Sequence, residues 1–278
     1  MRNLRSTLRL LLTAAAVLGA LVAAAPASAA PTWAPADSAA IRPGVQTISD
    51  SGQCTSNFVF YDAAGNVYIG QAAHCTGTGS QTDTNGCATS SLPLGSPVDV
   101  QGASKPGTLA YNSWLTMAQV GEKDPDTCQY NDLALVKLDP ADAANVNPTV
   151  KFWGGPTGIN RTGTVAGDEV YSYGNSSLRL GIENLSPKRG YSLGTDSGGW
   201  NHSVYTITPG IPGDSGSAFL DAQGRALGVL STLAIAPLAG SNGVGDIAHE
   251  LDYLNAHGGL GTVTLADGTE PFDSGRLL

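Results

Sequence analysis

The chain has 278 residues with 14 Lys and Arg against 23 Asp and Glu, a formal net charge of −9 that excludes an extended basic surface for nucleic acid. Charged residues make up only 13% of the chain, whereas Gly and Pro number 36 and 16, so short strands joined by turns are expected rather than long salt-bridged helices. This composition is compatible with an enzyme, a binding module or a structural protein.

The N-terminal region is the first recognisable element. Three arginines in the first nine residues precede an apolar run over 10–25 and the small-residue triplet Ala27-Ser28-Ala29. This arrangement predicts a secretory signal peptide, residues 1–29, with cleavage after Ala29. A membrane anchor is the alternative, but about sixteen apolar residues are fewer than the roughly 20 that a spanning helix needs. We therefore expect a secreted, extracellular protein without membrane contact once the signal is removed.

The rest of the chain has the pattern of a β protein. Residues 30–45 are rich in Ala and Pro and are expected to be loosely ordered. From Cys54 onward short runs recur between turn signals, at a spacing that indicates an all-β sandwich or barrel. The Pro- and Asn-rich stretch 140–160 is the best candidate for a connection between two domains. The runs are Asn57–Tyr61, Val67–Ala73, Pro97–Val100, Thr108–Trp114, Leu133–Leu138, Glu169–Tyr173, Val204–Thr208, Ala218–Leu220 and Ala226–Leu230.

One convincing helical pattern occurs near the end of the chain. The helix is predicted over about 246–257, where apolar residues recur at helical spacing from Ile247 to Leu254. Asp246 is placed to cap its first turn, and Gly258-Gly259 ends it.

The four cysteines, Cys54, Cys75, Cys87 and Cys128, all follow the predicted signal peptide. An even number of cysteines outside the cytoplasm indicates two disulfides, and four cysteines allow three pairings. None of them forms a C-x-x-C pair, so a zinc or redox site is not favoured.

Three short segments carry residues with the chemistry of nucleophilic catalysis. His74 ends an apolar run beside a cysteine, Asp132 precedes another apolar run, and Ser215 lies in a glycine-rich turn. A serine hydroxyl needs an adjacent base to act as a nucleophile, and the imidazole in turn needs a carboxylate to fix its tautomer. The order His, Asp, Ser is that of chymotrypsin-type enzymes and differs from the subtilisin and α/β-hydrolase orders.

These segments resemble the signature blocks of the chymotrypsin-like (trypsin-like) serine protease family, close to its secreted bacterial branch. The resemblance covers roughly residues 41–257. It implies an all-β fold of two six-stranded antiparallel β-barrels packed together, with a C-terminal helix. The first barrel, the His/Asp half, is expected over 46–145, and the second, the Ser half, over 146–278 with the helix and tail. The blocks are Gly70-Gln71-Ala72-Ala73-His74-Cys75, Asn131-Asp132-Leu133-Ala134-Leu135-Val136 and Gly213-Asp214-Ser215-Gly216-Ser217-Ala218.

The resemblance also implies a role for each residue. His74 is the general base and acid, Asp132 orients it, and Ser215 is the nucleophile. The backbone N–H groups of Gly213 and Ser215 form the oxyanion hole, for which a glycine lets the amides converge. Ser231 matches the serine that supports the buried aspartate. No metal or cofactor is implied.

The function that follows is a secreted, monomeric serine endopeptidase, which cleaves protein or peptide substrates through an acyl-enzyme intermediate. Two alternatives remain open. The first is a catalytically silent protein of the same fold that binds a partner, and the second is a serine hydrolase directed at esters.

A second serine competes for the role of nucleophile, because Asp196-Ser197-Gly198-Gly199 matches the sequence that the family more commonly has around its nucleophile. Ser215 is preferred since Gly213 stands two residues before it, whereas Thr195 stands two residues before Ser197. The strand and turn that follow Ser215 also reproduce the family's pattern.

The remaining implications concern disulfides and specificity. The family pattern implies the pairs Cys54–Cys75 and Cys87–Cys128. Pro209 stands where a trypsin-like member places an acid, and Leu233 occupies a wall of the pocket, so small or apolar substrate side chains are expected. The apolar dipeptide followed by two glycines that begins many relatives is missing, which leaves the partner of Asp214 open.

Overall fold

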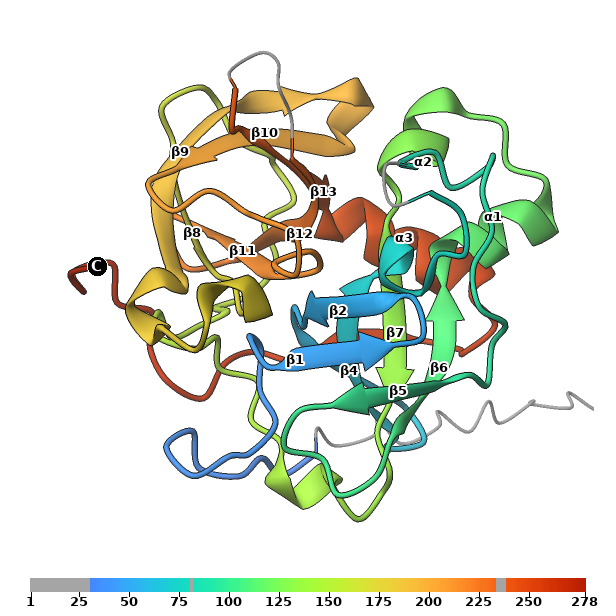
Figure 1. The fold of residues 1–278 in the computed structure, drawn as a ribbon, viewed down its shortest axis with the longest axis horizontal. Coiled ribbons are helices and arrows are strands. Elements are labelled where there is room, and N and C mark those ends of the chain that lie inside the picture. Colours follow the sequence, from blue (N-terminus) through green and yellow to red (C-terminus); the bar gives the residue numbers. More distant parts are fainter. Residues whose placement is uncertain (1–30, 81–82, 234–238) are drawn as a thin grey trace, which may run out of the picture.

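The computed structural model describes residues 31–80, 83–233 and 239–278. This part of the chain is organised as two β-sheets and three α-helices, joined by turns and loops (Figure 1). None of the helices in these ranges has the length and apolar character to cross a membrane. The predicted signal peptide, residues 1–29, lies outside the described residues.

The C-terminal half contains a closed antiparallel barrel in the order β10-β13-β12-β11-β8-β9. Apolar side chains from five of these strands fill a fully buried core, which explains why the runs predicted from the sequence become strands. This barrel agrees with the expectation for the Ser half. Its strands are β8 (Glu169–Tyr173), β9 (Pro187–Asp196), β10 (Asn201–Thr206), β11 (Ala218–Asp221), β12 (Ala226–Leu233) and β13 (Asn242–Asp246).

The N-terminal half, joined by β14 from the C-terminal tail, forms an eight-stranded sheet in the order β14-β3-β4-β7-β6-β5-β1-β2, rather than the closed six-stranded barrel expected there. Its central strands β4 and β7 are buried along nearly their whole length. The chain leaves the edge strand β2 where Thr55 N donates to Ser215 O at 2.8 Å, so this edge contacts the other half. The strands are β1 (Gln46–Ser49), β2 (Gly52–Thr55), β3 (Val59–Asp62), β4 (Val67–Ala72), β5 (Pro97–Val100), β6 (Gly107–Asn112), β7 (Leu133–Lys137) and β14 (Val263–Leu265).

The predicted C-terminal helix is confirmed as α3 (Ile247–His257). Asp246 caps it by accepting a hydrogen bond from His249 N at 2.8 Å, and Gly258 follows its last turn. Two short helices, α1 (Ser113–Val120) and α2 (Pro125–Tyr130), were not expected from the sequence. Five 3₁₀ turns complete the set: η1 (Ala73–Thr76), η2 (Ala143–Asn145), η3 (Ser177–Arg179), η4 (Glu183–Leu185) and η5 (Ser197–Gly199).

The segment before β1 is better ordered than its composition predicts. Ile41 and Val45 are fully buried, and Ile41 N donates to Asn145 O at 3.1 Å. The chain between β7 and β8 connects the two sheets, and Trp153 within it is buried with its indole N–H donating to Ser172 O at 2.7 Å. Both segments therefore belong to the core: Ile41 and Val45 pack in the cluster of the N-terminal sheet, and Trp153 packs in the cluster that joins the two halves.

Candidate active site

His74 and Asp132 are brought together by two paired strands. Ala72, the last residue of β4, pairs with Leu133, the first residue of β7, so the residues that follow one strand and precede the other are neighbours. The backbone joins them further, because Ala73 N donates to Asp132 O at 2.7 Å. The chain turns away from the sheet in η1, which contains His74, and the His74 ring is left partly exposed.

The carboxylate of Asp132 is almost fully buried and accepts three hydrogen bonds. His74 N donates to Oδ1 at 2.9 Å, His74 Nδ1 lies 2.7 Å from Oδ2, and Ser231 Oγ donates to Oδ2 at 2.6 Å. Since an ionised carboxylate only accepts hydrogen bonds, Nδ1 carries the ring proton and Nε2 is left as a proton acceptor. The geometry therefore prepares His74 as a base.

The charge on Asp132 also sets the basicity of His74. Burial alone lowers the pKa of the imidazole, but the attraction and the hydrogen bond of Asp132 outweigh it. The net effect raises the pKa of His74 above its ordinary value of 6.5.

Ser215 lies in two consecutive turns between β10 and β11. Asp214 N donates to Ile211 O at 2.8 Å, and Ser217 N donates to Asp214 O at 3.1 Å. The third residue of each turn is a glycine with positive φ, +94° at Gly213 and +87° at Gly216, as a type II turn requires. A Cβ on Gly216 would stand 2.6 Å from Thr55 O, so this position also needs glycine for space.

The two turns around Ser215, residues 211–217 and below called the Ser215 turn, are fixed to both halves. Thr55 Oγ1 and Gln53 Nε2 donate to Gly213 O at 2.8 and 2.9 Å, and Gly216 N donates to Leu230 O of the barrel at 2.7 Å. Among the described residues, the N–H groups of Gly213 and Ser215 have no acceptor, and Ser215 Oγ makes no hydrogen bond to His74. Catalytic hydrogen bonds are often long without substrate.

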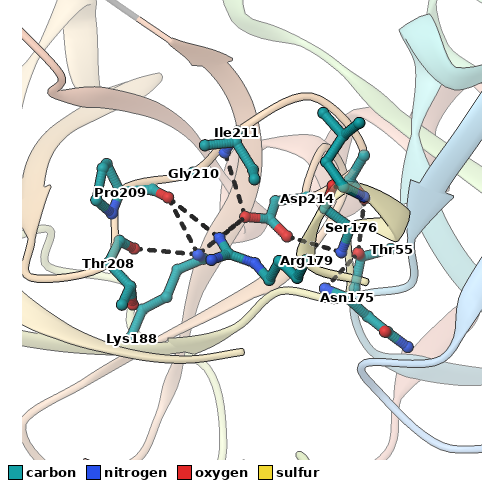
Figure 2. Close-up of polar contacts among 12 residues, drawn as sticks. Thr55, Asn175, Ser176, Arg179, Lys188, Thr208, Pro209, Gly210, Ile211 and Asp214 are labelled. Carbon is teal, nitrogen blue, oxygen red and sulfur yellow. Dashed lines mark hydrogen bonds and ion pairs between the residues drawn. The ribbon is translucent and has the colours of Figure 1, made fainter. Parts of the chain in front are cut away.

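Asp214, next to Ser215, is fully buried between two cations (Figure 2). Arg179 Nη2 and Lys188 Nζ lie 2.5 and 2.9 Å from its Oδ2. Backbone N–H groups complete the shell: Ser176 N donates to Oδ1 at 3.0 Å and Ile211 N to Oδ2 at 3.2 Å. This cluster answers the question that the sequence left open about the partner of Asp214.

Lys188 has an unusual environment because its side chain has no exposed surface. Besides Asp214, its ammonium donates to Thr208 O at 3.0 Å and Pro209 O at 3.3 Å, so all three of its protons have acceptors (Figure 2). Burial lowers the pKa of Lys188 to about 8, against the opposing attraction of Asp214. Lys188 thus ties the segment before the Ser215 turn to Asp214.

The residues predicted to form the specificity pocket lie on either side of Asn242. The carbonyl oxygen of Pro209 accepts hydrogen bonds from Arg179 and Lys188. Leu233, at the end of β12, is 55% exposed. The buried side chain of Asn242 joins the two sides, because its Oδ1 accepts from Gly210 N at 2.8 Å and its Nδ2 donates to Thr232 O at 3.1 Å. No pattern in the sequence indicates this role of Asn242.

A second residue that the sequence analysis missed is Glu250. It is fully buried on α3, and its Oε1 accepts a hydrogen bond from Asp132 N at 2.9 Å. A signal existed, since Glu250 lies three residues after Ile247 and four before Leu254, on the apolar face of the predicted helix.

The competing serine occupies a different environment. Ser197 begins η5 at the barrel end, with φ of +53°. The nearby carboxylate of Asp246 is already bound by His202 Nε2 at 2.9 Å and His249 Nδ1 at 2.8 Å. Among the described residues, no hydrogen bond joins Ser197 to either histidine. Ser197 therefore lies near a carboxylate whose two histidine contacts do not include the serine.

The structure contains the disulfides Cys54–Cys75 and Cys87–Cys128, the two pairs that the resemblance implied. The first joins β2 to η1, next to His74, and the second joins a loop to α2, shortly before Asp132. The sulfurs of Cys54 and Cys75 lie near the His74 ring, but as disulfide sulfurs they are not thiolate ligands for a metal.

Comparison with family descriptions and with curated proteins gives no match. Solved structures do match. Protease A of Thermobifida fusca is 19% identical, with 83% of this chain and 100% of that chain covered and a TM-score of 0.52. A Nocardiopsis protease is 18% identical over 81% of this chain and 98% of its own, with a TM-score of 0.49. A glutamic acid-specific serine protease is 20% identical over 81% and 100%, with a TM-score of 0.48. The chain has the fold of chymotrypsin-like bacterial serine proteases.

Proposed function

We propose that the protein is a secreted serine endopeptidase in which Ser215, His74 and Asp132 form the catalytic triad. The observation that carries this proposal is the buried Asp132 carboxylate, which binds the backbone and ring of His74 and the hydroxyl of Ser231. A histidine held by such a contact has a defined tautomer and an acceptor nitrogen, which is what a serine nucleophile requires.

The reaction follows from these positions. Ser215 Oγ attacks the carbonyl carbon of the scissile peptide bond while its proton passes to His74 Nε2. Asp132 remains ionised and stabilises the imidazolium through the 2.7 Å contact with Nδ1. His74 then gives the proton to the leaving amine, and an acyl-enzyme on Ser215 remains. Water attacks this ester with His74 again as base, which releases the acid and restores Ser215.

The negative charge that develops on the carbonyl oxygen needs two hydrogen-bond donors. In our proposal these are the N–H groups of Gly213 and Ser215, which have no acceptor within the described residues. The two type II turns hold these groups in place before substrate binds, and Thr55 and Gln53 hold the turns by their bonds to Gly213 O. Preorganised donors of this kind need no rearrangement during the reaction.

The Asp214 cluster bears on how the enzyme becomes active. Arg179 and Lys188 already supply positive charge to this buried carboxylate, so no newly formed amino terminus is required to pair with it. Removal of the signal peptide after Ala29 would then be sufficient for a competent Ser215 turn.

The remaining parts of the proposal concern location and substrate. Secretion follows from the signal at 1–29 and agrees with two disulfides, which persist in oxidising compartments. The domain boundary lies near residue 145, with the His/Asp half before it and the Ser half after it. Pro209 and Leu233 offer no charge to a substrate, so small or apolar side chains are the proposed preference, with the protein acting as a monomer without a cofactor.

Labelling with a fluorophosphonate tests the proposal on the secreted protein. The reagent should modify Ser215, as found by peptide mapping, and Ser215→Ala should not be labelled while Ser197→Ala is. Absence of labelling would favour the silent binding protein. Labelling accompanied by turnover of ester substrates but of no denatured protein would favour the ester-directed hydrolase.

A further inference from the structure

Glu250 is a buried acid in direct contact with the backbone of the proposed triad. It lies in the first turn of α3, the helix that extends from the barrel across to the N-terminal half (Figure 1). Its Oε1 is the acceptor for Asp132 N at 2.9 Å. The space it occupies depends on Gly245, where a Cβ would stand 2.7 Å from Oε1 and 2.9 Å from Tyr130 O.

The surroundings of Glu250 disfavour a charge. Among the described residues it makes no ion pair with Lys, Arg or His, and its Oε2 has no hydrogen-bond partner. The titratable groups that face it are Asp132 before β7, Asp246 at the start of α3 and the Tyr111 hydroxyl of β6. A fully buried carboxyl that faces two aspartates without a cation is stable only in its protonated form. Burial and these charges raise the pKa of Glu250 well above its ordinary value.

We propose that Glu250 is a positioning residue for the triad, which as a neutral carboxylic acid accepts the Asp132 N–H and thereby fixes the carboxylate of Asp132 against His74. This inference rests on the proposed function. It assigns to α3 a part in the His/Asp half of the site, although α3 directly follows the barrel.

Neutrality matters because Asp132 already carries the charge that His74 needs. A second buried negative charge behind Asp132 would raise the pKa of His74 further, and protonated His74 cannot accept the serine proton. A neutral acceptor fixes the Asp132 backbone without adding that charge. Glutamine preserves both properties, whereas methionine preserves the volume and removes the acceptor.

Three variants separate these effects in the full-length secreted protein. Glu250→Gln should retain kcat and should leave the acidic limb of the pH profile, which reports His74, at its wild-type position. Glu250→Met should lower kcat on the order of tenfold with little change in KM, because a buried N–H loses its acceptor. The matched control is Asp252→Asn, which removes an exposed carboxylate from the same helix and should change neither quantity.

Two NMR measurements test the same proposal without relying on proteolysis. The downfield proton resonance of His74 Nδ1–H reports its hydrogen bond to Asp132 and should persist in Glu250→Gln but weaken in Glu250→Met. The ¹³C resonance of the Glu250 carboxyl, assigned by its absence from Glu250→Gln, should remain at the protonated position from about pH 5 to pH 8. This second measurement needs only the wild-type protein and Glu250→Gln, so it decides the charge state even if Glu250→Met does not fold.

The outcomes that overturn the proposal are specific. A downward shift of the acidic limb in Glu250→Gln, or an ionised ¹³C signal at neutral pH, would show that Glu250 is charged. Wild-type kcat and an unchanged Nδ1–H resonance in a folded Glu250→Met would show that it does not position Asp132. Failure of the proposed function would appear differently, as an absence of turnover and of fluorophosphonate labelling in the wild-type protein.

Discussion

The two halves hold their parts of the candidate site by different means. In the N-terminal half, the disulfides Cys54–Cys75 and Cys87–Cys128 lie next to His74 and shortly before Asp132. The C-terminal half has no cysteine and holds the Ser215 turn through a buried carboxylate with two cations. One half is stabilised by covalent bonds that carry no charge, and the other by charges that are costly to bury.

This difference makes the halves sensitive to different conditions. A disulfide acts mainly by restricting the unfolded chain, so its contribution disappears on reduction and is insensitive to pH. A buried ion cluster depends on the protonation of each member and on the presence of every partner. The candidate site lies where the halves meet, so it requires both kinds of support at once.

The largest expected effect comes from removing the nucleophile of the C-terminal half. Ser215→Ala should lower turnover of a peptide substrate by a factor on the order of 10⁶, as the loss of a triad serine does. Ser197→Ala should leave turnover within a few-fold, because that side chain lies outside the His74–Asp132 network. Steady-state kinetics on both variants decide the matter, and an inactive Ser197→Ala would place the site elsewhere in this half.

The next effect tests the ion cluster. Asp214→Asn leaves Arg179 and Lys188 buried without a counter-charge, and should cost about 3–5 kcal/mol in the free energy of unfolding. Lys188→Met should cost less, because Asp214 keeps Arg179 and the buried charges become balanced. Urea unfolding of both variants gives the comparison. Equal losses would show that the lysine, rather than the balance of charge, holds the segment before the turn.

Reduction tests the covalent half. The chain-entropy relation gives roughly 3 to 4 kcal/mol for each disulfide, so reduction should destabilise the segments that carry His74 and Asp132 first. Hydrogen exchange followed by mass spectrometry should show early loss of protection in β4 and β7, while β11 and β12 remain protected. Proteolytic activity should fall together with the protection of β4 and β7. Simultaneous loss of protection in both sheets would mean that the halves unfold as a single unit.

The same contrast explains what the sequence could predict. His74, Asp132 and Ser215 each lie in a short segment whose residues and order can be recognised in the sequence. Asp246, as the N-cap, predicts where α3 begins. Local residues determine these features. The closed C-terminal barrel was predicted from the family resemblance. The apolar runs themselves marked only four of its strands, β8, β10, β11 and β12, and missed β9 and β13.

The residues that could not be predicted act across the fold. Arg179, Lys188 and Asn242 reach the Ser215 turn or the segment before it from elements distant in sequence, and nothing near them in the chain marks their partners. The three-residue strand β14 is too short to show a pattern, yet it joins the N-terminal sheet through β3. Glu250 was visible as a polar residue on an apolar helix face, but only the structure shows its contact with Asp132.

The smallest expected effect is a pH dependence of the free energy of unfolding that arises from Lys188 in the C-terminal half. Lys188 has a pKa lowered by burial to about 8, against an ordinary value of 10.5. Between these values the unfolded chain binds more protons at this position than the folded one, so the stability contributed by this group rises with pH. This contribution of Lys188 is fully present above 10.5, its pKa in the unfolded chain. It is lost as the pH falls through about 8, its pKa in the folded protein.

Urea unfolding at a series of pH values, with wild type compared to Lys188→Met, measures this contribution directly. The difference in unfolding free energy should be flat below about pH 8 and should move in favour of the wild type by roughly 1 to 3 kcal/mol toward pH 10.5. Lys105→Met, which removes an exposed lysine paired with Asp139, serves as the control and should show no such slope. A difference that moves against the wild type with rising pH would mean that the folded cluster favours the charged lysine, and that Asp214 outweighs the cost of its burial.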